Sequence, residues 1–357
     1  MGNIFSWFVR HLLVHDHPPP PILQLPVEIL LEITAYLEPH PVSLGSLTLT
    51  CRAFYRLLQH CLHERHDEIT QGLLALLEKD LGHKYYHCTG CRKLHTFDPY
   101  LTDGLTAWQY HPPATKSRNC CRDLRGFSPN YGSAQILDRV IARLVTNRHL
   151  YGAPNGLRLT VLRTPGWAWS WEGGPLWLQS SDGRIVDGEL ILRTKHELQG
   201  RGHSVREAIN EGRYRLCHHV MTDPLDLVYP RRNSLQHVPE LADIDVLKTC
   251  ENGSGSCNVC LMDYTITIRQ AEAREPMYST TAPGAVYYRV VPNGWQVTMV
   301  SYHLLGECRD EDDWKWKASV GSGKYSDPIC KGNERDLDAF PPGQVKRMWD
   351  SLNQATL

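Results

Sequence analysis

Hydrophobic residues recur every three or four positions in several stretches of the chain, which is the spacing of a helix with one buried face. Residues 67–81 show it most clearly, since Ile69, Leu73, Leu76 and Leu77 fall on one side. The same spacing predicts a helix at residues 133–146. It also predicts a short helix near the C-terminus, with Val345, Met348, Trp349 and Leu352 on one face.

The pattern changes after residue 154, where apolar and polar positions begin to alternate as in a half-buried strand. Residues 157–161 and 167–171 alternate in this way, the second with three tryptophans. Further strands are predicted at residues 184–192, 264–268, 286–291 and 295–302. The fold class is therefore α+β: a short N-terminal helical module is followed by a larger mixed body with an antiparallel sheet.

Proline sets the first boundary, because residues 15–24 contain four consecutive prolines and favour an extended backbone. We divide the chain into an N-terminal tip and spacer at residues 1–24, a helical module at 25–60 and the body at 61–357.

The helical module has more apolar residues than two short helices bury between themselves. Leu25-Pro26 opens the first helix, since proline is tolerated in a first turn. Ile29, Ile33 and Leu37 continue it at helical spacing. The surplus predicts a surface for a partner helix, whereas the alternative is an ordinary helical hairpin within a core.

The residues of this module resemble an F-box: Leu25-Pro26-x-Glu28-Ile29 is followed by Cys51-Arg52-x-Phe54. The resemblance implies docking on the Skp adaptor of a cullin-type SCF ubiquitin ligase, with the rest of the chain capturing a protein substrate. More weakly, residues 142–157, 184–192, 214–220, 256–264 and 294–314 resemble segments of a group of fungal F-box proteins. The partner-binding residues that the F-box resemblance implies are Leu25, Pro26, Ile29, Ile33, Leu37, Leu47, Cys51, Phe54 and Leu57.

Composition excludes some partners and locations. The 38 Lys+Arg and 39 Asp+Glu give a net charge of −1, and no basic patch stands out, so we expect no nucleic-acid partner. No apolar run reaches the ~18 residues of a spanning helix, and the N-terminus lacks the features of a secretory signal. We therefore expect a cytoplasmic or nuclear protein whose 12 cysteines favour metal binding over disulfides.

The cysteines form two clusters with the donors of structural zinc sites. The first has Cys88 and Cys91 in a CxxC pair, with His87 and His95 beside them. Cys120 and Cys121 follow about thirty residues later and complete the predicted set.

The second cluster is centred on another CxxC pair and has five donors for four ligand positions: Cys217, His219, Cys250, Cys257 and Cys260. Two alternatives stay open. The thiols are buried as small hydrophobic groups, or a crossed site joins Cys88 and Cys91 to Cys257 and Cys260.

No motif for phosphate binding, a nucleophilic serine or a catalytic zinc occurs, so we expect no enzyme activity. Two other functions are considered. One is a zinc-stabilised scaffold, tethered to a membrane or free, without a role in ubiquitination. The other is a hydrolase with an open zinc position at Cys217, His218 or His219.

The first six residues fit the pattern for N-myristoylation, which would place an acyl chain on Gly2. One acyl chain binds membranes only marginally, and Trp7 and Phe8 would add the second contact. Peripheral membrane contact is one prediction; the alternative is that this apolar tip docks on the protein itself.

Overall fold

The computed structural model divides into two compact units, Met1–Thr96 and Phe97–Leu357. The predicted body begins at residue 61, whereas residues 61–96 belong to the same compact unit as the N-terminal helices. We call the second unit the body. The structure describes residues 21–50, 52–64, 66–88, 91–97, 127, 137–169, 174–210, 216–217, 219–221, 233–234, 241–243, 245–257, 260–278, 286–309, 313–320 and 340–354.

The first unit is mostly helical and ends in a β-hairpin. The predicted helix at residues 67–81 is confirmed as α5, with nearly the same bounds. Pro26 precedes α2, and its carbonyl oxygen accepts hydrogen bonds from the N–H groups of Ile29 and Leu30. The elements are η1 (Pro21–Gln24), α2 (Val27–Leu37), α3 (Pro41–Thr50), α4 (Arg52–Glu64), α5 (His66–Leu81), β1 (Tyr85–Cys88) and β2 (Lys93–Thr96).

Two glycines allow α3 and α5 to pack closely. A Cβ on Gly45 of α3 would collide with Ile69 of α5. A Cβ on Gly72 of α5 would collide with Val42 of α3. Because each glycine faces a branched side chain of the other helix, this reciprocal fit fixes the register of the pair.

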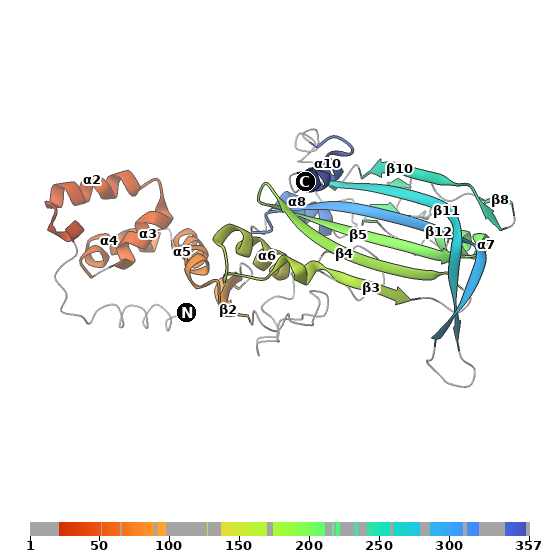
Figure 1. The fold of residues 1–357 in the computed structure, drawn as a ribbon. Helices are drawn as coiled ribbons and strands as arrows, with labels where there is room; N and C mark the ends of the chain where they lie inside the picture. The colour runs from red at the N-terminus through yellow and green to blue at the C-terminus, as the bar shows by residue number, and fades with distance from the viewer. Residues whose placement is uncertain are drawn as a thin grey trace. The chain divides into compact units, whose positions relative to one another are not determined.

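The body is built on a six-stranded antiparallel sheet with the order β10-β11-β12-β5-β4-β3 (Figure 1). Its predicted class is therefore confirmed. The strands are β3 (Thr164–Trp169), β4 (Leu176–Val186), β5 (Glu189–Gly200), β10 (Cys250–Ser256), β11 (Met262–Tyr278) and β12 (Val286–Gly306). The other body elements are α6 (Arg139–Tyr151), η2 (Leu159–Leu162), α7 (Gly202–Asn210), β6 (Val220–Met221), β7 (Asn233–Ser234), β8 (Leu241–Asp243), β9 (Val246–Leu247), α8 (Trp314–Val320) and α10 (Gln344–Gln354).

Apolar residues cover both faces of this sheet. On one face Ile266, Val297 and Leu198 lie in a large cluster that includes α7 and the second group of cysteines. On the other face Tyr302 and Leu304 pack against α10 through Val345 and Trp349. Successive residues of a strand point to opposite faces, so the central strands are apolar at nearly every position.

Asp263 of β11 fixes the C-terminal helix to the second face. Its carboxylate accepts hydrogen bonds from the backbone N–H groups of Gly343 and Lys346, at 2.8 and 3.0 Å. These are unpaired donors at the start of α10, so a side chain from the sheet caps the helix. The predicted helix with Val345, Met348 and Trp349 on one face is thereby confirmed.

Three details of the sequence prediction were wrong. Residues 184–192 form the end of β4, a turn and the start of β5, because Asp187 and Gly188 adopt φ values of 51° and 82° and close a two-residue hairpin. Residues 159–162 form a 3₁₀ turn instead of a strand. The helix predicted at 133–146 begins at Arg139, because the carboxylate of Asp138 accepts a hydrogen bond from the N–H of Val140 and caps it.

None of the helices in the described residues is both long enough and apolar enough to cross a membrane.

Candidate functional site

The core of the first unit around α2, α3 and α4 is small. Leu44, Phe54 and Leu58 are its buried residues. Leu30, Leu37 and Leu47 pack against them and stay partly exposed. Helix α2 contributes no fully buried residue, and it packs against the core through a narrow face that contains Leu30 and Leu37.

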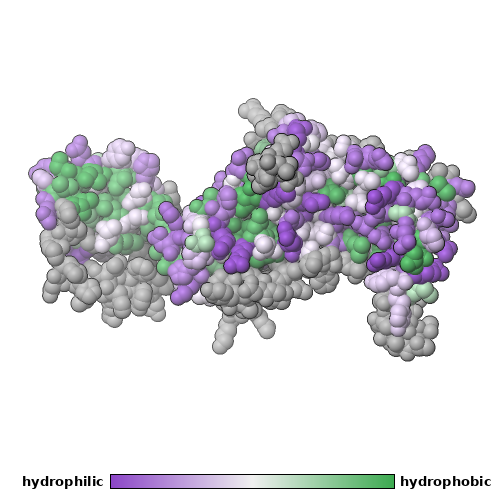
Figure 2. Space-filling view, viewed as in Figure 1, coloured by the Kyte–Doolittle hydropathy of each residue, from purple (hydrophilic) through white to green (hydrophobic). Residues whose placement is uncertain are grey.

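The apolar surface of α2 is far wider than that side. At about 100° per residue, its apolar positions cover an arc of roughly 220° around the helix axis. Leu30 and Leu37 occupy the middle of this arc and face the core. Val27 and Leu31 flank it on one side and are 52% and 50% exposed, while Ile29 and Tyr36 flank it on the other. Apolar residues gather over this region in the space-filling view (Figure 2).

The predicted partner-binding residues divide into two groups. Leu25, Pro26, Ile29 and Leu57 are exposed, and Ile33 is half-buried. Leu37, Leu47 and Phe54 instead belong to or pack against the small core, so they hold the helices together from within. Cys51 lies outside the described residues. Sequence periodicity did not select Val27 and Leu31, although their four-residue spacing on an otherwise apolar helix is the signal that would have found them.

Comparison with known families assigns this unit. Residues 22–68 match the model of the F-box-like family. The chain carries an F-box-like domain. This match confirms the resemblance to an F-box that the sequence predicted. F-box domains typically bind Skp-type adaptors in cullin complexes, which supports the predicted general class of partner. No curated protein and no solved structure matched the chain, so the resemblance of the body to fungal proteins stays a prediction.

Outside the F-box-like domain, the body brings together four side chains of the kinds that bind metal ions. The ligand atoms of Cys217, His219, Cys257 and Cys260 all lie within 4.8 Å of one another, and all four residues are buried. Atoms about 2.3 Å from a common tetrahedral zinc ion lie roughly 3.8 Å apart, so the group fits such an ion after a small contraction. Cys217 and His219 come from the segment before β6, and Cys257 and Cys260 lie between β10 and β11.

Backbone N–H groups already point at two of these sulfurs. The Sγ of Cys217 accepts hydrogen bonds from the N–H groups of His219 and Val220, both at 3.3 Å. The Sγ of Cys257 accepts one from the N–H of Cys260 at 3.4 Å. Such donors stabilise thiolates and orient them toward a metal.

Electrostatics restrict how many of these thiols ionise without a cation. Burial and the nearby Cys257 raise the pKa of Cys217. Hydrogen bonding to the other two thiols, followed by burial, raises the pKa of Cys260. Burial also opposes ionisation of Cys257, but hydrogen bonds from the surrounding thiols and His219 outweigh it and hold that pKa well below its usual value. A divalent cation at the centre of the cluster would favour the ionised form of all three thiols.

Cys250 is the spare donor among the five predicted. It lies on β10 opposite Ile268, is partly buried against the large apolar cluster, and does not belong to the four-residue group. Its Sγ is 4.0 Å from the carbonyl oxygen of Ile266. The structure therefore separates the four neighbouring donors from Cys250, which the sequence left open.

The first cysteine cluster is only partly described. Cys88 ends β1, Cys91 lies in the following turn and His95 is on β2. These three donors lie within 4.8 Å of one another, and the Sγ of Cys91 is 2.8 Å from the Nε2 of His95. Of the two predicted histidines, His95 and not His87 joins this group. Burial, followed by the charge of Lys93, lowers the pKa of His95, which favours the neutral ring that binds metals. Cys120 and Cys121, predicted as further ligands, lie outside the described residues.

Proposed function

We propose that the chain is the substrate-recognition subunit of a cullin-type SCF ubiquitin ligase, with residues 25–58 binding a Skp-type adaptor and the body binding a protein target. The observation that carries the adaptor half is the apolar arc of α2, which is broader than the small core beneath it. An unpartnered apolar helix in an F-box-like domain is a surface of the kind that partner helices cover.

We propose further that zinc is a structural component of the body, bound by Cys217, His219, Cys257 and Cys260. Four buried Cys and His ligands close a tetrahedral site and leave no position for a substrate or water. On this proposal the chain performs no catalysis, the ubiquitin chemistry belongs to other subunits, and the protein acts in the cytoplasm or nucleus. Such a closed set disfavours the hydrolase alternative.

The adaptor half is tested by a pull-down of purified adaptor with the full chain and with a double variant, Ile29→Asp and Leu31→Asp. Both side chains are exposed, so the substitutions leave the core intact while placing two charges on the apolar arc. We expect loss of adaptor binding with an unchanged circular dichroism spectrum. The matched control is Leu76→Asp, an exposed leucine on α5 beyond the matched family region.

Retained binding by the double variant would overturn the adaptor half of the proposal. The substrate half is tested separately by reconstituting the ligase and following ubiquitination of proteins that co-purify with the chain. Adaptor binding without modification of any co-purified protein would favour the scaffold alternative.

A further inference from the structure

The longest two strands extend beyond their neighbours as a two-stranded arm. Residues 273–278 of β11 pair with 286–291 of β12, whereas β10 reaches only Ile268 and β5 ends at Gly200, opposite Trp295 (Figure 1). We call residues 272–278 and 286–293 the arm. Within the described part of the chain, no strand pairs with the outer edge of β12 along the arm, so its backbone groups there are available to another strand.

The arm exposes apolar side chains that the sheet does not use. Met277, Tyr287, Tyr288 and Val290 are 50, 61, 48 and 51% exposed. Met277 and Tyr287 are cross-strand partners on one face of the arm, and Tyr288 and Val290 share the other face. Clustered large apolar side chains at such exposure are typical of a contact surface.

A groove of about 440 Å³ lies where β5 stops and the arm continues. Both apolar and polar side chains line it. Its residues come from β4, β5 and the arm: Leu176, Leu178, Gln199, Glu272, Arg274 and Tyr288.

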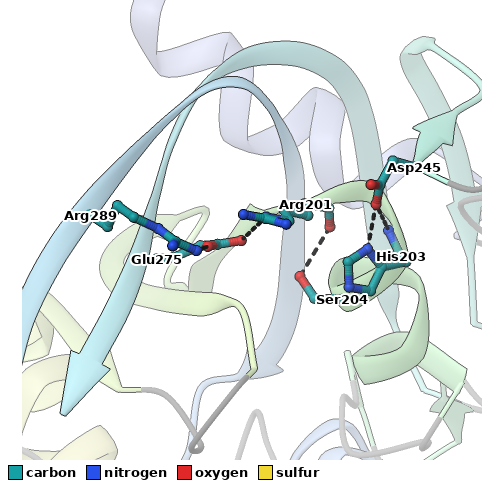
Figure 3. Close-up of polar contacts among 6 residues, drawn as sticks. All are labelled: Arg201, His203, Ser204, Asp245, Glu275 and Arg289. Atoms are coloured by element: carbon teal, nitrogen blue, oxygen red, sulfur yellow. Dashed lines mark hydrogen bonds and ion pairs between the residues drawn. The ribbon is translucent and has the colours of Figure 1, made fainter.

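Charge around the groove is unbalanced. Glu275 accepts ion pairs from both Arg201 and Arg289, at 3.4 and 2.5 Å, so one carboxylate faces two guanidinium groups (Figure 3). Arg269 donates to the neutral amide of Gln296. Lys195 and Glu197 pair with each other and add no net charge.

Arg274 projects from the arm into the groove without an ion-pair partner among the described residues. Around the groove, the four arginines at positions 201, 269, 274 and 289 lie with three acidic residues, Glu272, Glu275 and the Asp245 near Arg201, which leaves a net charge of 4 − 3 = +1. An occupant of this surface therefore gains from negative charge.

We propose that the arm and its groove bind an extended acidic segment of the protein target, which adds a strand to the outer edge of β12. Its main chain pairs with the free edge of residues 286–291. Its alternate side chains then meet Tyr288 and Leu178, or place a carboxylate on Arg274. This inference rests on the proposed function, because it assigns the target-binding surface of the body.

The probe is a fluorescein-labelled nine-residue peptide of alternating valine and aspartate, titrated into the full chain and followed by fluorescence anisotropy. We expect saturable binding that weakens with added salt, and no binding of the peptide in which lysine replaces aspartate. A peptide with proline at alternate positions lacks the N–H groups for strand pairing and should also fail to bind.

Arg274→Glu and Tyr288→Ala should each weaken binding about tenfold or more, since a charge-assisted hydrogen bond or a buried aromatic contact is worth about 1.5 kcal/mol. Arg158→Glu is the matched control, because Arg158 is an exposed arginine next to η2, which packs near Gly183 at the other end of β4. All three variants should retain adaptor binding, so a failure here is distinguishable from a failure of the adaptor half.

Equal binding of the lysine and aspartate peptides, or unchanged binding by Arg274→Glu, would overturn the proposal. So would a concentration-dependent dimer that Tyr288→Ala dissociates, because a second copy of the chain would then be the occupant of the arm.

Discussion

The F-box-like domain and the body distribute their apolar residues in opposite ways. The helices of the first have a core of three buried side chains and leave most of α2 exposed. The body buries residues on both faces of its sheet and leaves large apolar side chains exposed mainly at the arm. In the first unit, apolar side chains are exposed because the core is too small to cover them, whereas in the body most of the exposed apolar side chains lie on a segment that extends past the core. The apolar arc of α2 and the arm are therefore the surfaces that can bind partners without loss of the buried contacts that stabilise each unit.

The comparison is tested most severely by Phe54→Ala. Removing a buried aromatic side chain costs about 3–5 kcal/mol, and the F-box-like core has only two other buried residues to compensate. We expect the first unit to unfold while the body retains its own melting transition, as measured by calorimetry of the full chain. Leu57→Ala, at the exposed neighbouring position on α4, should leave both transitions within about 0.5 kcal/mol of wild type. A single transition that shifts as a whole would mean that the two units do not unfold separately.

Replacing Cys257 and Cys260 with serine should destabilise the body and spare the first unit. A metal present at about 1,000 times its Kd contributes about 4 kcal/mol to stability, and that contribution is lost when two ligands are removed. The measurements are metal content by mass spectrometry and the melting temperature of the body with and without a chelator. Cys250→Ser is the matched control, since Cys250 lies outside the four-residue group. Equal metal content in all three proteins would rule out this site.

Acid should weaken the body through His196, a fully buried residue of β5. Burial lowers its pKa from 6.5 to about 4. Between these values the unfolded chain binds a proton that the folded chain does not, so stability is complete above pH 6.5 and declines as the pH falls toward 4. The full decline is on the order of 3 kcal/mol.

Urea unfolding between pH 4 and 7 measures this dependence. His196→Gln should flatten it, whereas His149→Gln, at an exposed histidine of α6, should not. An unchanged slope in His196→Gln would show that another group is responsible.

Local sequence patterns predicted correctly those features of the structure that depend on residues close together in the chain. The spacing of Ile69, Leu73 and Leu77 predicted α5, and the two CxxC pairs predicted where metal ligands gather. The remaining features depend on contacts between distant residues. That Asp263 caps α10 follows from the docking of a helix 80 residues away in the sequence. That Cys250 is spare and that His95 joins Cys88 and Cys91 follow from the pairing of strands, which the residue spacing alone does not determine.

The boundary errors have a different origin. Asp138 ahead of α6 and Asp187-Gly188 between β4 and β5 are recognised signals for a helix start and a hairpin turn. The apolar pattern continues across both, so periodicity alone extended each predicted element through them. Capping and turn residues therefore have to be weighed against periodicity when elements of this body are assigned.

The hairpin turn gives the smallest and most local test. Gly188 adopts φ 82° with open space where a Cβ would lie, so Gly188→Ala adds backbone strain without a steric clash. We expect a loss of about 1 kcal/mol in the stability of the body, measured by urea unfolding. Asp187→Asn should be nearly neutral, since asparagine also tolerates the left-handed conformation at that position. If Gly188→Ala were as stable as wild type, the buried residues along the strands, and not the turn, would set the register of β4 on β5. The core would then determine the structure of this hairpin, as it does in the rest of the body.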